Sequence, residues 1–242
     1  MPTTTCLPAQ TLKALQKYDT PTICNVIELF DVRPRTAGYM DDTIRACFPK
    51  MPPMVGYALT VKFGAADANP PRPVYDSLAE QAKTLQQLGG PGVIVFEDTD
   101  DPTVAATFGE VMCTTYKAFG AAGLITSGAG RDLDQVEAIG FPVFTNGTIC
   151  AHGYCTMIEL NVPVNVGGIT INPGDLLHGD LNGVTTVPHE FAADLPDLCE
   201  KFMAAEKVTL DYVTGPNITI DGFLESGAEQ RRMIKAIADS LK

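Results

Sequence analysis

Up to Phe144, short apolar runs alternate with stretches whose apolar residues recur every three or four positions. The runs predict strands at 55–63, 93–96, 123–126 and 142–144. The amphipathic stretches predict helices over 11–30, with a break at Thr20-Pro21, then over 77–88 and 110–119, and a short one opened by Arg131-Asp132. Thr20 is a good N-cap, and Pro21 fits the first helical position. Strands that alternate with helices indicate βα units with some parallel pairing.

After Phe144 the pattern becomes β-rich, with tight turns containing Gly, Pro and Asn. Strands are expected at 162–166, 169–171 and 184–187, and residues 31–53 and 64–73 are expected to be loops. A helix is expected over 190–208, where Pro196 kinks it or shifts its start. A strand-like segment at 218–220 and a final helix from about residue 225 complete the chain.

Composition narrows the classes of partner and compartment. The chain has 242 residues, enough for one large domain, and no linker divides it. Its 29 acidic and 17 basic residues give a net charge of −12, which argues against nucleic acid as a partner. No apolar stretch approaches the ~20 residues of a membrane span. Seven cysteines without a disulfide framework, and no signal peptide, predict a cytoplasmic protein with reduced thiols.

Gly109-Glu110-Val111-Met112 is the first candidate site, at the predicted start of a helix. Unpaired N–H groups and the positive end of the helix dipole suit a carboxylate or phosphate there, and Gly109 lets a ligand approach the backbone. Taken alone, the segment is a weak signal, because most such glycines simply start a helix.

Arg131-Asp132 is the second candidate, after a strand and the loop 127–130. Arginine can grip a carboxylate with two bonds, and aspartate offers hard oxygen to Mg²⁺. On spacing alone, Asp132 as a helix cap and Arg131 as a surface residue is the simpler interpretation. Each candidate follows a buried strand, however, so both turns are expected on one edge of the sheet, where they would form one site.

Other clusters have weaker claims to function. His152, His178 and His189 lie in different segments, so loop or packing roles are expected for them. The acidic run 97–101 lacks calcium-loop spacing and is expected to be a solvated loop. The sequence contains no nucleotide-binding, serine-hydrolase or zinc-protease motif.

Several motifs together are recognisable. They are Gly109-Glu110-Val111-Met112, Gly120-Ala121-Ala122-Gly123, Gly128-Ala129-Gly130-Arg131-Asp132, Pro173-Gly174-Asp175-Leu176 and Asp180-Leu181-Asn182-Gly183. In order and spacing, the chain from about Tyr18 to Val208 resembles the RraA-like family. That family includes the regulator of ribonuclease activity A and the 4-hydroxy-4-methyl-2-oxoglutarate aldolases.

The resemblance implies an α/β fold, a three-layer β/β/α swivelling-type single domain with mixed sheets and a C-terminal helical extension. It places the catalytic domain at 1–208 and an extension at 209–242, packed on the same domain or on a neighbouring subunit. It also implies a homo-oligomer, a trimer or a dimer of trimers, with the active site at a subunit boundary.

The aldolase branch implies a class II lyase that uses Mg²⁺, Mn²⁺ or another divalent cation on small 2-oxo acids. By position, Gly109, Glu110, Val111 and Met112 would bind substrate through backbone amides, and Arg131 would hold its carboxylate and keto oxygen. Asp132 would anchor the metal, and Glu110 would steer a water or proton. A catalytic Glu from a neighbouring subunit's C-terminal helix would be Glu206, with Glu200 next.

Three departures from the family pattern affect the surroundings of the metal. Ser127, Gln135 and Asn25 stand where relatives often carry acids, which predicts altered metal binding or substrate. Two alternatives stay open: a non-catalytic protein-binding regulator, or a related lyase or hydrolase acting on a different oxo acid. A methyltransferase is rejected, because the chain has no glycine-rich S-adenosylmethionine loop followed by an acidic strand end.

Overall fold

A computed structural model of the protein describes residues 6–69 and 72–241. Its main sheet has eight strands in the order β1-β7-β5-β3-β2-β12-β13, with β9 also paired to β2. The central strands β2, β3, β5 and β7 are parallel, as the alternating pattern predicts, and the flanking pairs are antiparallel. The strands are β1 (Arg45–Ala46), β2 (Met54–Gly64), β3 (Gly92–Asp98), β5 (Ala121–Thr126), β7 (Val143–Thr145), β9 (Thr156–Leu160), β12 (Leu176–Asp180) and β13 (Gly183–Val187).

Two smaller sheets accompany the main one. A parallel sheet joins β4 (Ala106–Phe108), β6 (Ala129–Gly130) and β8 (Gly147–Thr148). An antiparallel hairpin joins β10 (Val164–Val166) and β11 (Ile169–Ile171) through Gly167-Gly168. Both glycines have positive φ, 57° and 75°, which a two-residue hairpin turn of this kind requires.

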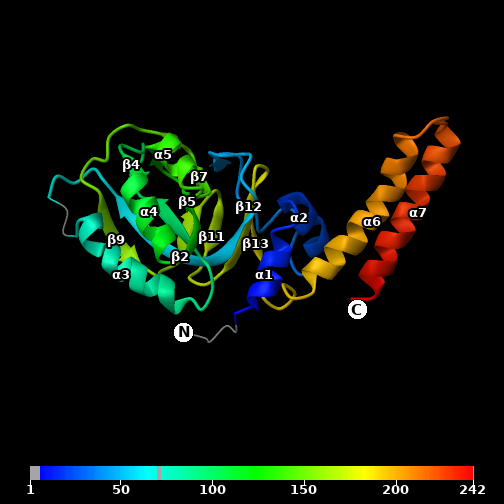
Figure 1. The fold of residues 1–242 in the computed structure, drawn as a ribbon, viewed down its shortest axis with the longest axis horizontal. Helices are drawn as coiled ribbons and strands as arrows, with labels where there is room; N and C mark the ends of the chain where they lie inside the picture. Colours follow the sequence, from blue (N-terminus) through cyan, green and yellow to red (C-terminus); the bar gives the residue numbers. More distant parts are fainter. Residues whose placement is uncertain (1–5, 70–71, 242) are drawn as a thin grey trace.

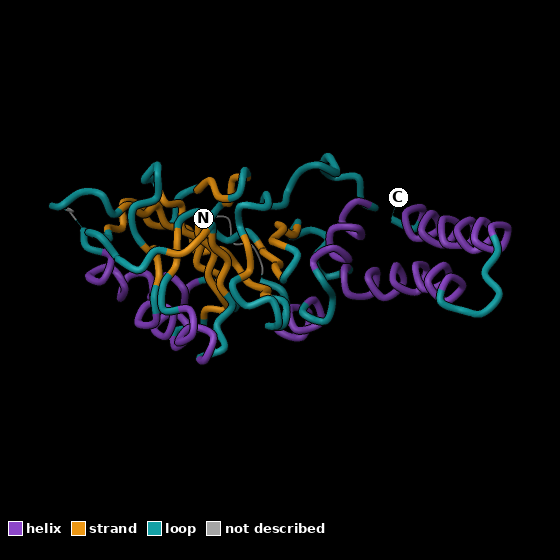
Figure 2. The backbone as a smooth tube through the Cα atoms, turned by 90° about the horizontal axis from the view of Figure 1, so that it is seen from above, coloured by secondary structure: helices purple, strands orange, loops and turns teal. Residues whose placement is uncertain are grey.

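The main sheet lies between a layer of helices and the β10–β11 hairpin. Side chains alternate along β2: Leu59, Val61 and Phe63 pack with the helices α3 (Val74–Gln87), α4 (Glu110–Ala118) and α5 (Leu133–Ala138). Ala58 lies on the other face, in the core that includes Val164 and Val166 of the hairpin. The layers are therefore β, β and α, and Figure 2 shows the helices of the body gathered along one side of its strands.

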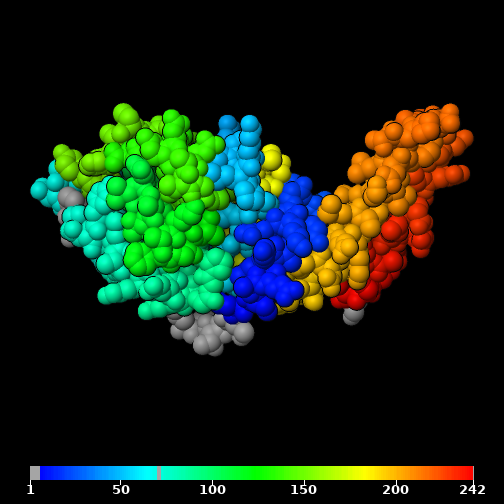
Figure 3. Space-filling view, in the orientation of Figure 1, coloured from blue at the N-terminus to red at the C-terminus, as the bar shows by residue number. Residues whose placement is uncertain are grey.

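A second core joins the body to the C-terminal helices. Helices α1 (Ala9–Leu15), α2 (Thr20–Glu28) and α6 (Leu195–Val213) pack against Tyr57, Leu176 and Val187 of the sheet. Helix α7 (Ile220–Asp239) turns back along α6, and Ile237 is its one buried side chain. The α6–α7 hairpin projects away from the body (Figures 1 and 3). The predicted division after residue 208 falls inside α6 and stays a prediction.

Several local predictions were wrong. Asp19, not Thr20, is the N-cap of α2, because its carboxylate accepts the Thr22 N–H at 2.9 Å. The segment 218–220 is not a strand, since Thr219 caps α7, which begins at Ile220. The helix expected from residue 190 begins at Leu195, so Pro196 lies in its first turn: the expected shift of the helix start is confirmed, and a kink does not occur. Strands β9 and β12 were not predicted.

Among the described residues, no helix is both long and apolar enough to span a membrane.

Candidate active site

The segment Gly109–Met112 forms the entry to helix α4, directly after strand β4. Gly109 is buried in an extended conformation, and the Glu110 and Val111 side chains are exposed. The Met112 side chain packs in the core, so only its backbone can face a ligand. The N–H groups of Val111 and Met112 have no hydrogen-bond partner among residues 6–69 and 72–241. Two backbone donors of the first turn are therefore available to an anion.

Arg131 and Asp132 follow strand β6, and the Arg131 N–H donates to the Phe108 carbonyl of β4 at 3.2 Å. Asp132 has a left-handed backbone, with φ 56° and ψ 39°, at the N-cap position of α5. Its side chain makes no cap bond to α5. The carboxylate oxygen Oδ2 instead accepts the Glu110 N–H of α4 at 3.0 Å. The simple interpretation of Asp132 as the cap of its own helix is therefore wrong.

The two candidate segments lie side by side. Arg131 Nε is 3.8 Å from Asp132 Oδ2, and the two side chains are 26% and 38% exposed. A Cβ atom placed on Gly109 would lie 2.6 Å from Asp132 Oδ2 and 3.1 Å from Arg131 Nε. The expected convergence of the segments is present, but it occurs on the small sheet, where Phe108 pairs with Gly130, and not on the main sheet. That these residues bind a substrate stays a prediction.

The donor atoms at this place suit a hard cation. Asp132 uses only Oδ2 in its bond to α4, and the exposed Glu110 carboxylate has no hydrogen bond or ion pair within residues 6–69 and 72–241. Mg²⁺ is usually held by one or two carboxylates, waters and substrate oxygens, so the carboxylate of Asp132 fits it. No group of three or more His, Cys, Asp or Glu side chains that could form a complete metal cage occurs within the described part of the chain.

Glu206 lies far from these residues within one chain. It belongs to α6, which stands at the opposite end of the molecule from α4 and α5 (Figure 1). Burial, and then the nearby charge of Asp19, raise the pKa of the Glu206 carboxyl. Its predicted role, like that of Glu200, requires a neighbouring subunit and stays a prediction.

Asp98 is a polar residue of this region that the sequence analysis missed. It ends strand β3, so the expectation of a solvated loop at 97–101 is wrong for this position. Its Oδ2 atom is buried without a hydrogen bond, and burial is the main cause that raises the pKa of its carboxyl. A Cβ on Gly128 would lie 2.5 Å from that oxygen. Its position at the carboxyl end of a buried strand was the available signal.

The histidines serve packing and loop structure, as expected. His178 is fully buried, with Nδ1 3.0 Å from Thr20 Oγ1 and Nε2 3.2 Å from the Leu15 carbonyl. Burial lowers the pKa of its imidazole. His189 stacks on Tyr57, and His152 lies in an exposed loop.

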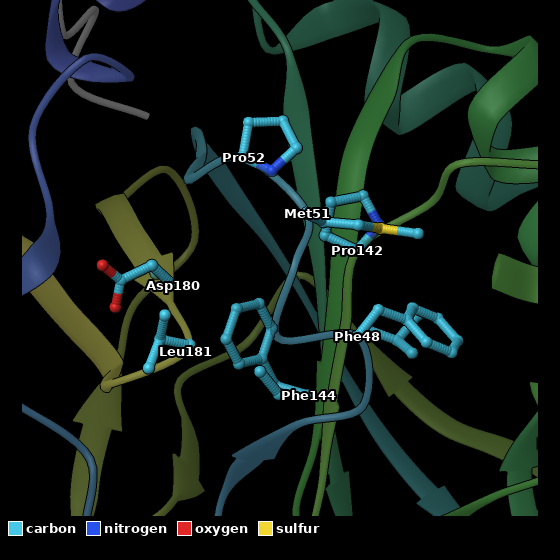
Figure 4. Close-up of a pocket in the computed structure, with 10 residues that line it drawn as sticks. Phe48, Met51, Pro52, Pro142, Phe144, Asp180 and Leu181 are labelled. Carbon is cyan, nitrogen blue, oxygen red and sulfur yellow. The ribbon is translucent and has the colours of Figure 1, made fainter.

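One small hollow lies elsewhere, between the segment 46–52 and the β12–β13 turn (Figure 4). Its volume is about 10 Å³, close to what one water needs. Asp180 on its wall already accepts the N–H groups of Thr20 and Asn182. Residues 109–112 and 131–132 do not line it, so the hollow is no substitute for the α4 site.

Comparison with known proteins adds independent information. The RraA-like family model, described as Aldolase/RraA, matches residues 20–186. A protein of Halalkalibacterium halodurans named "Putative 4-hydroxy-4-methyl-2-oxoglutarate aldolase" is 30% identical over 164 residues, which cover 62% of this chain and 78% of that protein.

Two solved structures share the fold. An uncharacterized protein of Pseudomonas syringae superposes with a TM-score of 0.71 at 22% identity, over 91% of this chain and 96% of that one. RraAS2 of Streptomyces coelicolor, described as an unusual member of the RNase ES inhibitor RraA family, gives 0.65 at 22% identity, over 83% and 96%.

Proposed function

The chain belongs to the RraA-like family, and from that premise we propose that it is a divalent-metal-dependent class II lyase. Its proposed reactions are the cleavage of 4-hydroxy-2-oxo acids to pyruvate and the decarboxylation of oxaloacetate. The observation that supports this most directly is the position of Arg131 and Asp132 beside the free N–H groups of α4. A cation, a guanidinium and two amide donors would there act on one small anion.

Substrate binding is assigned to the backbone and to Arg131. The Val111 and Met112 N–H groups would donate to the substrate carboxylate, where the dipole of α4 also favours negative charge. The Glu110 N–H already donates to Asp132, so it would fix that side chain and leave the substrate to the other two amides. Arg131 would orient the keto oxygen and stabilise the charge that develops on it.

Both reactions pass through the same product ion. Breaking the bond between C3 and C4 of a 4-hydroxy-2-oxo acid requires loss of the hydroxyl proton and leaves the bonding pair on a pyruvate enolate. Loss of CO₂ from oxaloacetate leaves the same enolate, and a proton then adds at C3. Glu110, exposed in the first turn of α4, would hold the proton that adds at C3 or pass it through water.

Asp132 would hold Mg²⁺ or Mn²⁺. The bound ion would supply Lewis-acid stabilisation of the developing oxyanion. Asp132 has its backbone and one oxygen already fixed, so its second oxygen is presented in a defined direction.

We further propose a homo-oligomer in which Glu206 of one copy completes the site of another. The seven free cysteines support a reducing compartment, the cytoplasm.

Pyruvate release tests the proposal. The purified full chain is assayed with Mg²⁺ on oxaloacetate and a panel of 4-hydroxy-2-oxo acids, and pyruvate is measured through lactate dehydrogenase. We expect activity that a chelator removes and Mg²⁺ restores. Arg131→Ala should lower kcat/KM by about 10²–10³-fold, the usual cost of losing one group that stabilises an oxyanion. Arg45→Ala, an exposed arginine on β1, is the matched control and should be silent.

Two results would refute the lyase assignment. One is a full rate in Arg131→Ala. The other is the absence of pyruvate release from every substrate together with no binding of Mg²⁺ at Asp132. The second result would favour the non-catalytic, protein-binding alternative.

A further inference from the structure

A second hollow lies at the end of helix α2, beside the edge strand β13 and on different elements from the α4 site. Its volume is about 40 Å³, room for a small ligand group or a few waters. The groups on its wall that matter for charge are Arg33, Arg35, Glu28 and the Cys24 thiol. Ile27 and Pro34 add an apolar rim.

Arg33 is held in place by neutral acceptors only. Its Nη1 group donates to the carbonyl and hydroxyl of Thr186 at 3.1 and 2.7 Å, and its Nη2 group to Thr185 Oγ1 at 3.1 Å. The guanidinium also packs closely on Gly38, at φ 87°, where a Cβ atom would overlap it. The side chain is therefore fixed before any ligand arrives, which reduces the entropy lost on binding.

The charge of Arg33 has no counter-ion in the described parts of the chain, 6–69 and 72–241. Its Nε–H has no acceptor there, and no carboxylate forms an ion pair with it. Burial is the leading cause that lowers the pKa of Arg33, and only the ionised form of Cys24, which burial itself disfavours, would oppose it. A half-buried cation is costly unless an anion accompanies it.

The other charges on the wall cancel each other. Glu28 Oε2 lies 3.5 Å from Arg35 Nε, so these two side chains form an ion pair. Arg35 is 78% exposed and can reorient toward a ligand, whereas Arg33 cannot. The net charge at this hollow is therefore positive, in a chain whose total charge is −12.

We propose that the hollow beside Arg33 is a binding site for a small anion that carries a carboxylate or phosphate group. The Arg33 guanidinium supplies the fixed charge, and Arg35 closes over the bound anion. Both anion types use the same charge-assisted bonds to a guanidinium, so a comparison of the two as probes identifies the source. The site does not depend on the lyase assignment.

Cys24 provides a probe inside the hollow. The wild-type protein is treated with the neutral reagent iodoacetamide at pH 9, and alkylation of each cysteine is followed by peptide mass spectrometry. Potassium phosphate, potassium propionate and potassium chloride are compared at equal ionic strength. Phosphate or propionate should slow alkylation of Cys24 at least five-fold and saturably, while chloride has no such effect. Alkylation of the exposed Cys150 is the internal control and should not change.

Isothermal titration of wild type, Arg33→Gln and Arg35→Gln with the same two anions gives a second measurement. Arg33→Gln should weaken binding about ten- to one-hundred-fold, the worth of a charge-assisted bond. Arg35→Gln should have a smaller effect. Retention of the wild-type circular dichroism spectrum by Arg33→Gln shows that it is folded. The proposal is overturned if neither anion binds to wild type, or if Arg33→Gln binds as tightly as wild type.

Discussion

Replacement of Gly109 by alanine tests whether the approach of two turns creates the α4 site. The backbone of Gly109 is extended, at φ −156°, a conformation that alanine adopts without strain. The new Cβ atom would lie 2.6 Å from Asp132 Oδ2, so the carboxylate has to move away from the Glu110 N–H. Arg131 Nε, at 3.1 Å, has to yield slightly as well.

The expected change in stability is small. The bond from the Glu110 N–H to a partly exposed carboxylate contributes about 1–1.5 kcal/mol, between a typical hydrogen bond and the weakest bonds to charged groups. Alanine restricts the unfolded chain and returns about 0.4–1 kcal/mol. The net loss is therefore about 0.5 kcal/mol, which lowers Tm by about 1–2 °C in a chain of this size.

The expected change in activity is large. Displacement of a positioned group by about 1 Å can cost about 10²-fold in rate. Gly109→Ala should therefore lower kcat/KM for pyruvate release by about 10²-fold while Tm barely changes. Gly147→Ala, in strand β8 of the same sheet, meets no atom within 4 Å and is the matched control. If Gly109→Ala keeps both the activity and the Mg²⁺ affinity of wild type, the close approach of these turns has no catalytic role.

Three further predictions concern stability. Burial lowers the pKa of His178, so below about pH 6.5 protons bind the unfolded chain preferentially. The free energy of unfolding should therefore fall as pH drops through that value, by up to about 1.4 kcal/mol per pH unit. Urea unfolding from pH 7.5 to 5.5 measures this fall, and His178→Gln should reduce the dependence of stability on pH. Asp19→Ala should cost about 1 kcal/mol through loss of the α2 cap, whereas Asp19→Asn should cost little, as judged by urea midpoints. Burial raises the pKa of Asp98, so its ionisation opposes folding above about pH 4. Asp98→Asn should gain about 1 kcal/mol at pH 7 and nothing at pH 4, and an unchanged Tm at pH 7 would contradict this.

The strands of the core and the convergence of the site could be predicted from sequence, but the way the site is assembled could not. Residues 93–96 and 123–126 are continuous apolar runs, the pattern of strands buried on both faces. Strands β4 and β6 have three and two residues, too short for any periodicity, yet they are the pair that places Gly109 beside Arg131. Short strands of this kind are defined by their neighbours, which a local pattern does not contain.

The predicted ends of helices were wrong for a related reason. Asp19 and Thr20 are both good caps in isolation, and the choice is made by tertiary contacts. The Thr20 hydroxyl lies beside His178, and the backbone N–H of Thr20 donates to Asp180. Because Thr20 bonds to residues of the sheet, Asp19 is the residue that caps the helix. The partners lie more than 150 positions away in the chain, beyond the reach of any window of sequence.

Asp132 shows why a strained residue is informative about function. An aspartate at an N-cap usually has an extended backbone and bonds to its own helix, which costs no strain. Asp132 instead has a left-handed backbone, which costs about 1 kcal/mol or more, and its carboxylate bonds to a different helix. A stabilising cap alone would favour the cheaper arrangement. The observed one is accounted for if Asp132 has to hold Oδ2 beside both the Glu110 N–H and Arg131 and present Oδ1 to a cation, as the proposed metal site requires.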